Sequence, residues 1–165
     1  IGMPGLGKTT LARKTYNDPF IVYHFHIRAW ITVSQVYEKS DLLLRILSSA
    51  QIPLTGETEE LSDEILSSAQ LPLKGETEEL SDERCPCNRR VDKKLGEKLY
   101  KSLKGKKYLI VMDDIWNIGA WEDLKRSFPD DNNGSRIMFT NRLLDVVPLH
   151  AKPYYMRFLN EDESW

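Results

Sequence analysis

Hydrophobic positions follow two different periods along the chain, and each period predicts one kind of element. Within residues 25–34 every second position is apolar, which is the period of a β-strand with one buried face. Within residues 108–114 an unbroken apolar run ends in two acids, as expected for a strand buried on both faces of a parallel sheet. Further strands are predicted at residues 136–140 and 154–159.

Helices are predicted where apolar positions recur every three or four residues. One covers residues 8–16 and ends at Asn17-Asp18-Pro19, because Pro19 has no N–H and restricts the residue before it. Another starts from an N-cap at Ser40-Asp41. A third has a basic outer face and an apolar stripe formed by Val91, Leu95, Leu99 and Leu103. A short helix is marked by Trp121, Leu124 and Phe128, and a last one would start at residues 160–164.

The N-terminal stretch fits the phosphate-binding pattern G-x-x-x-x-G-K-[ST]. Glycines let such a loop curl around a polyphosphate with its N–H groups pointing inward, and the following helix directs its partially positive N-terminus at the same phosphates. The lysine adds a charge beside the β- and γ-phosphates, and the next hydroxyl is offered to Mg²⁺. The residues predicted to bind the nucleotide here are Gly2, Met3, Gly5, Leu6, Gly7, Lys8, Thr9 and Thr10.

Two acids end the buried strand, at the edge of a parallel sheet where α/β proteins bind ligands. Asp113 is predicted to hold Mg²⁺ through water, together with Thr9, and Asp114 to orient or deprotonate an attacking water. A strand followed by two acids is a weak signal alone, but it is a strong one downstream of a phosphate-binding loop. Arg142 follows the next strand and is predicted to reach the γ-phosphate; a surface arginine is the alternative.

Two adjacent and nearly identical segments interrupt this pattern. Residues 46–64 and 65–83 differ only at Ile52/Leu71 and Thr55/Lys74. A solenoid needs about three or more repeats that bury one another's faces, so we interpret residues 46–83 as a tandem duplication of a helix end and an acidic loop. Their composition predicts a poorly ordered surface insertion; a duplicated recognition element is the alternative.

Composition and charge limit the class of protein. The chain has 165 residues, of which 41% are apolar and 29% charged, and a net charge of −2, which suits one soluble domain or part of one and gives no overall signature of nucleic-acid or membrane binding. The longest apolar run, residues 109–112, is too short to cross a membrane. Cys85 and Cys87 are closer in sequence than zinc ligands usually are, so we expect free thiols in a cytoplasmic protein. His26 is expected to lie on a strand face rather than to bind a metal.

Several segments together resemble the NB-ARC nucleotide-binding domain of plant disease-resistance proteins of the NBS-LRR class. The matching segments are GMPGLGKTTLA at 2–12, FHIRAWITVSQ at 25–35, KKYLIVMDDIW at 106–116, GSRIMFTNR at 134–142 and FLNEDESW at 158–165. Trp116 and the WITVSQ segment are similar to the coiled-coil class, and residues 16–37 are similar to late-blight-resistance proteins.

This resemblance implies a three-layer P-loop NTPase fold with a parallel sheet, and a switch controlled by ADP and ATP. In the family, ADP holds the receptor closed, and exchange for ATP opens it for homo-oligomerisation and defence signalling. The implied partners are the nucleotide with Mg²⁺ and the other domains of the same receptor. The residues matching Lys8 and Thr9 bind phosphate and Mg²⁺, those matching Asp113 and Asp114 serve Mg²⁺ and hydrolysis, and the arginine matching Arg142 senses the γ-phosphate.

The sequence also departs from the family. Asn141 stands where the family usually has threonine, and residues 1–165 look like a partial NB-ARC domain that lacks the strand before the phosphate-binding loop. Because that strand is central in the family's sheet, we expect residues 1–165 alone to be unstable and to bind nucleotide poorly.

Two alternatives to the switch stay open. One is a turnover P-loop ATPase, in which hydrolysis drives work, and the other is a non-functional gene fragment, which the duplication supports. Position 114 favours the switch, since fast ATPases of this type commonly have the longer glutamate there. We therefore expect at most slow hydrolysis of ATP.

Overall fold

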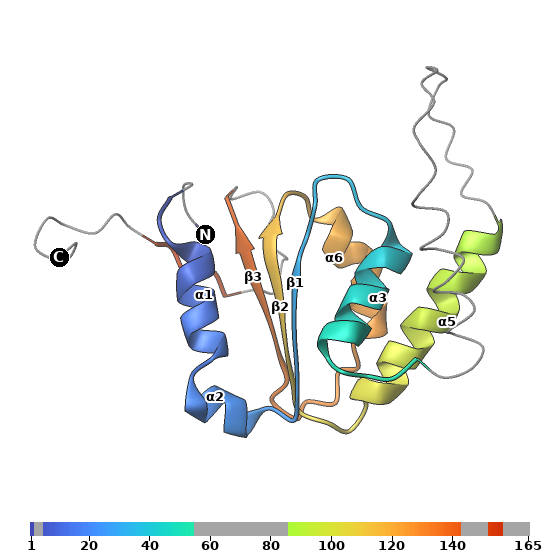
Figure 1. The fold of residues 1–165 in the computed structure, drawn as a ribbon, viewed down its shortest axis with the longest axis horizontal. Coiled ribbons are helices and arrows are strands. Elements are labelled where there is room, and N and C mark those ends of the chain that lie inside the picture. The colour runs from blue at the N-terminus through green and yellow to red at the C-terminus, as the bar shows by residue number, and fades with distance from the viewer. Residues whose placement is uncertain (2–4, 55–85, 143–151, 157–165) are drawn as a thin grey trace, which may run out of the picture.

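A three-stranded parallel sheet with helices on both faces forms the described part of the chain (Figure 1). The computed structural model describes residues 1, 5–54, 86–142 and 152–156. The strands follow the order β1-β2-β3, and β2 pairs with both neighbours. Their bounds are β1 (Ile27–Thr32), β2 (Tyr108–Ile115) and β3 (Arg136–Asn141). The predicted α/β class, with its apolar strand buried inside a parallel sheet, is confirmed.

The helices are divided between the two faces of the sheet (Figure 1). One face carries α1 (Lys8–Tyr16) and α2 (Pro19–His24). The other face carries α3 (Lys39–Ser49), α5 (Pro86–Leu103) and α6 (Gly119–Leu124), which continues into the 3₁₀ turn η2 (Lys125–Ser127).

The larger hydrophobic core lies between the sheet and α3, α5 and α6. The predicted stripe of α5 is confirmed, because its four apolar residues all belong to this core. Helix α3 contributes Leu42, Leu43, Ile46 and Leu47, each fully buried. The first copy of the repeat therefore begins inside a core helix, at Ile46. The remainder of the predicted insertion, from residue 55 onward, lies outside the described residues.

The core on the α1 side of the sheet is much smaller. It contains Phe25, Leu109 and Val111, with partly buried neighbours that include Tyr16 and Trp30. Ala12 is the only buried residue of α1. The C-terminal end of α1 is also attached to β1 by contacts of Tyr16. Its ring meets Trp30 edge-on at 5.5 Å, and its carbonyl accepts a hydrogen bond of 2.8 Å from the guanidinium of Arg28.

Helix α2 is an element that the sequence analysis does not predict. The segment Asn17-Asp18-Pro19 does end α1, but it also starts the next helix. The carboxylate of Asp18 accepts a hydrogen bond of 2.9 Å from the N–H of Phe20, which makes Asp18 the N-cap. Pro19 occupies the first helical position, where its missing N–H would have no helical partner in any case.

Several predicted boundaries are wrong by a few residues. Strand β1 is shorter than residues 25–34, because Phe25 is the C-cap of α2 and packs into the smaller core, opposite the predicted face. Helix α3 starts after Glu38 without a side-chain cap, and not at the predicted N-cap of Ser40-Asp41. The short helix after β2 ends earlier than predicted, since Phe128 already has an extended backbone.

Ile1 pairs with a segment near the other end of the described chain. Its amino group donates to the carbonyl of Tyr154 at 2.9 Å, and its carbonyl accepts from the N–H of Met156, also at 2.9 Å. This is the hydrogen-bond pattern of a parallel strand pair. Residues 152–156 nevertheless form no regular strand, so the strand predicted at 154–159 is not confirmed in its described part. The rest of it and the helix start predicted at 160–164 lie outside the described residues.

The tyrosine that opens β2 generates a pH-dependent prediction. Burial, together with the charges of Asp130 and Asp131, raises the pKa of Tyr108 from 10.0 to about 12, and its hydroxyl donates to the carbonyl of Pro129 at 2.8 Å. Because the folded pKa lies above the unfolded one, this contribution to stability is complete below pH 10 and is lost as the pH rises toward 12. We predict that Tyr108→Phe lowers the free energy of unfolding by about 1 kcal/mol at near-neutral pH.

Urea denaturation at about pH 8 and about pH 11 measures this effect, and the difference from wild type should be smaller at the higher pH. Tyr100→Phe, at an exposed position on α5, is the control and should change stability by less than about 0.5 kcal/mol at pH 8. If the loss of stability caused by Tyr108→Phe grew toward high pH, the assignment of a raised pKa to Tyr108 would be contradicted.

Candidate functional site

The described part of the predicted phosphate-binding loop has the backbone that its glycines predict. Gly5 and Gly7 have φ values of 84° and 75°, a left-handed conformation that glycine adopts without cost. No atom lies within 4 Å of the place where a Cβ would stand on Gly5, so the torsion angle, not crowding, requires glycine there. Gly2 and Met3 lie outside the described residues.

Gly7 is the N-cap of α1, so the helix starts directly at the lysine of the motif. Lys8, Thr9 and Thr10 form its first turn. In the first turn of any α-helix, the ladder of intrahelical hydrogen bonds does not use the backbone N–H groups. No acidic residue lies in that turn. The helix therefore presents an N-terminus that is suited to bind an anion.

The buried carboxylate of Asp113 lies at the centre of the site. It is only 4% exposed, and its Oδ1 accepts hydrogen bonds from the hydroxyl of Thr9 at 2.9 Å and from that of Thr140 at 2.5 Å. These residues come from α1, β2 and β3. One carboxylate oxygen thus joins α1 to two strands. Thr9 and Asp113, which the sequence predicts to hold Mg²⁺, lie within hydrogen-bonding distance of each other.

Thr140 is a site residue that the sequence analysis does not single out. Its hydroxyl donates to Asp113 and accepts from the N–H of Asp114 at 2.9 Å, so it fixes both acids. The available signal was its position near the end of a strand that follows the two acids. That position identifies Thr140 as a neighbour of the two acids only once the parallel pairing of β2 with β3 is known. The sequence alone does not show which strands pair.

Asp114 and Arg142 form an ion pair at the edge of the site. The Nε and Nη2 groups of Arg142 donate to the two carboxylate oxygens of Asp114 at 3.0 and 3.1 Å. Asp114 has a left-handed backbone with φ of 59°, where the register of β2 against β3 is irregular. The guanidinium also lies 4.7 Å from the ring centroid of Trp116. The arginine predicted to contact the γ-phosphate is therefore bound here to the acid predicted to orient water.

Lys8 belongs to the same electrostatic group. Burial lowers its pKa most, and the charge of Arg142 lowers it further, while the charges of Asp114 and Asp113 partly oppose this shift. The net lowering of the pKa means that the charged form of Lys8 is less favourable than in water. A phosphate bound at the loop would offset this cost.

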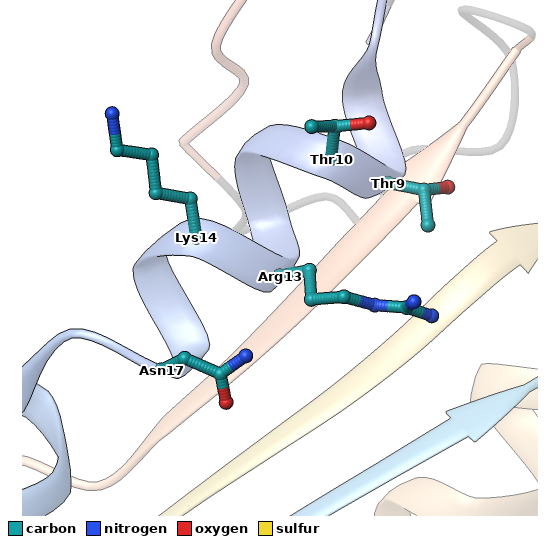
Figure 2. Close-up of a pocket in the computed structure, with 5 residues that line it drawn as sticks. All are labelled: Thr9, Thr10, Arg13, Lys14 and Asn17. Carbon is teal, nitrogen blue, oxygen red and sulfur yellow. The ribbon is translucent and has the colours of Figure 1, made fainter.

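A cavity of about 380 Å³ runs along the side of α1 from its first turn (Figure 2). Thr9 and Arg13 extend on the side of the strands, and Lys14 extends away from them. The Arg13 guanidinium lies 5.4 Å from the ring centroid of Trp30 on β1. The residues that line the cavity are Thr9, Thr10, Arg13, Lys14 and Asn17. It adjoins the first turn of α1 through Thr9 and Thr10.

The oxygen atoms of Thr9 and Asp113 fit Mg²⁺. This ion prefers oxygen ligands and is usually bound through one or two carboxylates together with substrate phosphates and water. Within the described ranges, no group of three or more His, Cys, Asp or Glu side chains is arranged to hold a metal by itself. The residues present therefore suit a Mg²⁺ ion that is also bound by nucleotide phosphates and water.

The family model of the NB-ARC domain matches residues 1–165. The chain belongs to the NB-ARC family. It is 47% identical over 167 aligned residues to the late blight resistance protein homolog R1B-8 of Solanum demissum, an alignment that covers 99% of this chain and 13% of that protein. The homologs R1B-14 and R1B-16 of the same plant are 40% and 39% identical, each over 99% of this chain.

The resemblance drawn from the motifs is confirmed by this NB-ARC match. The chain spans 10% of the length of R1B-14 and 11% of the length of R1B-16, so it corresponds to a small part of each relative. Across the described segments of this NB-ARC chain, no helix is both long and apolar enough to cross a bilayer.

The link through Thr140 generates a prediction for this NB-ARC domain. We predict that Thr140→Val lowers the free energy of unfolding by roughly 1–3 kcal/mol, because a buried carboxylate loses one of its hydrogen-bond donors. Thr140→Ser keeps the hydroxyl and should recover most of the loss. Chemical denaturation of the chain with its natural flanking sequence measures both changes.

Thr32→Val provides the matched control, since Thr32 ends β1 with an exposed side chain. This control should change the free energy of unfolding by less than about 0.5 kcal/mol. Equal effects of the two threonine-to-valine substitutions would show that the hydroxyl of Thr140 is not structurally important.

Proposed function

We propose that this chain is the nucleotide-binding part of an ADP/ATP switch in a plant immune receptor that acts in the defence response. The observation that carries the proposal is the shared carboxylate of Asp113. Through Thr9 it connects the first turn of α1, where phosphates would bind, to strands β2 and β3. The family supplies the choice of adenine nucleotide, and the late blight resistance homologs supply the setting of plant immunity.

The proposed roles follow the positions of the side chains. The loop and the first turn of α1 bind the phosphates, with Lys8 beside them, and Thr9 and Asp113 would hold Mg²⁺. When bound, the ion neutralises phosphate charge. Arg142 would contact the γ-phosphate and Asp114 would orient water, but only after their mutual ion pair opens.

A complete P-loop NTPase fold with three layers accommodates these roles. In that fold a strand precedes the phosphate-binding loop. We propose that such a strand ends at Ile1 and lies between β3 and the segment around Tyr154. The parallel hydrogen bonds of Ile1 with Tyr154 and Met156 support this arrangement. Among the described residues, β3 has a strand partner only in β2, which leaves its other edge for this strand.

The receptor would act in the cytoplasm, through other domains of the same protein and through homo-oligomers formed on activation. These points rest on the family and, for the location, on the interpretation of Cys85 and Cys87 as free thiols. Helix α2 offers a surface for contacts with further domains, since Phe20 is 70% exposed and Tyr23 is 91% exposed.

Binding of ADP and ATP by calorimetry tests the proposal directly. We predict that the chain with its natural flanking sequence binds both nucleotides with Mg²⁺, and that Lys8→Ala weakens this binding at least tenfold, the approximate effect of losing a charge-assisted hydrogen bond. Lys101→Ala is the control, because Lys101 is an exposed lysine in the last turn of α5, on the opposite face of the sheet (Figure 1). Absence of binding in a well-folded protein, or equal losses in the two variants, would contradict the proposal.

A turnover ATPase is the alternative, and the rate of hydrolysis distinguishes it from a switch. Asp114 makes a two-point ion pair with Arg142, so it is not poised to activate water. We predict steady-state hydrolysis well below about 1 s⁻¹, the lower end of typical enzyme turnover. Release of phosphate under saturating ATP measures it, and sustained rapid turnover would favour the ATPase. A disrupted reading frame would instead identify a non-functional gene fragment.

A further inference from the structure

We propose that Trp116 is a positioning residue that holds Arg142 against Asp114 and thereby lowers the affinity of the site for a nucleoside triphosphate relative to a diphosphate. The inference rests on the proposed function, since it concerns the same nucleotide site. It names a residue and a physical cause for the preference of the site between a nucleoside diphosphate and a triphosphate.

Three contacts define the position of Arg142. Two hydrogen bonds of 3.0 and 3.1 Å join its guanidinium to the carboxylate of Asp114, and its central carbon lies 4.7 Å from the ring centroid of Trp116. The arrangement of the two strands brings Arg142 and Trp116 together. Trp116 comes directly after β2, Arg142 comes directly after β3, and the two strands run parallel, so both residues leave the same edge of the sheet.

This position competes with phosphate binding. A guanidinium recognises a carboxylate or a phosphate with a pair of parallel N–H groups. The Nε and Nη2 groups of Arg142 form such a pair and are occupied by Asp114. To bind a γ-phosphate through them, Arg142 must leave both Asp114 and the indole ring. A diphosphate has no γ-phosphate and leaves these contacts intact.

Trp116 is the part of this arrangement that can be tested cleanly. The ion pair is partly exposed, at 40% for the Arg142 side chain and 28% for Asp114, so the ion pair alone contributes little to affinity. Replacing Asp114 would also remove a negative charge beside the bound phosphates and so would change nucleotide affinity directly. Trp116 is uncharged, so its replacement changes the contact with the guanidinium of Arg142 without changing the net charge of the site.

The experiment compares the affinities of ADP and a non-hydrolysable ATP analogue, measured by calorimetry on the chain with its natural flanking sequence. Trp116→Leu should raise the affinity for the analogue relative to ADP by about threefold to fivefold, the effect expected for one partly exposed cation–π contact. Trp116→Phe keeps an aromatic ring and should give a smaller change. In an Arg142→Ala background, Trp116→Leu should leave the ratio unchanged.

If Trp116→Leu leaves the affinity for the ATP analogue relative to ADP unchanged, or lowers it, the inference is overturned. An equal rise of this relative affinity in the Arg142→Ala background would also overturn it. Unfolding of the nucleotide-free protein gives a second measurement. Coupling between the substitutions at positions 116 and 142 in a double-mutant cycle supports the contact, and its absence refutes it. Failure of the wild type to bind either nucleotide overturns the proposed function as well, whereas binding with an unchanged ratio overturns this inference alone.

Discussion

A single buried carboxylate oxygen organises this end of the molecule. Oδ1 of Asp113 is shared by the hydroxyls of Thr9 and Thr140, so α1, β2 and β3 meet at one acceptor. Burying a charged group is costly unless hydrogen bonds and opposite charges compensate it. The two hydroxyls and the nearby charge of Lys8 offset part of that cost. The helix start and the sheet edge are therefore fixed relative to each other by the group that also suits Mg²⁺.

This constraint is important because α1 has little hydrophobic attachment of its own. Ala12 is its one buried residue, while the opposite face of the sheet is covered by a large core from α3, α5 and α6. The polar link at Thr9 and the aromatic contacts of Tyr16 hold the two ends of α1. A ligand that alters the charge near Asp113 can therefore affect the position of the helix, whereas the larger core gives the rest of the domain a rigid base.

The sequence predicted the parts of the structure that depend on local patterns. The apolar run before Asp113 and the four-residue stripe of α5 were sufficient to identify a buried strand and an amphipathic helix. Features that depend on tertiary pairing were missed. Thr140 becomes a site residue only because β3 lies beside β2, and the contact of Arg142 with Trp116 needs the same pairing. The start of α2 was missed for a different reason, because Asp18 and Pro19 serve one helix end and the next helix start at once.

The left-handed backbone of Asp114 restricts which residues can replace it. This conformation is tolerated by glycine, asparagine and aspartate far better than by longer side chains, for which it costs about 1–2 kcal/mol. A glutamate at this position would extend the acid toward a reacting water, but the same substitution would strain the end of β2. Replacing Asp114 with a longer acid therefore carries a conformational cost. The turn of the backbone would have to be rebuilt first, so the shape of the strand end itself restricts which acid can stand beside the site.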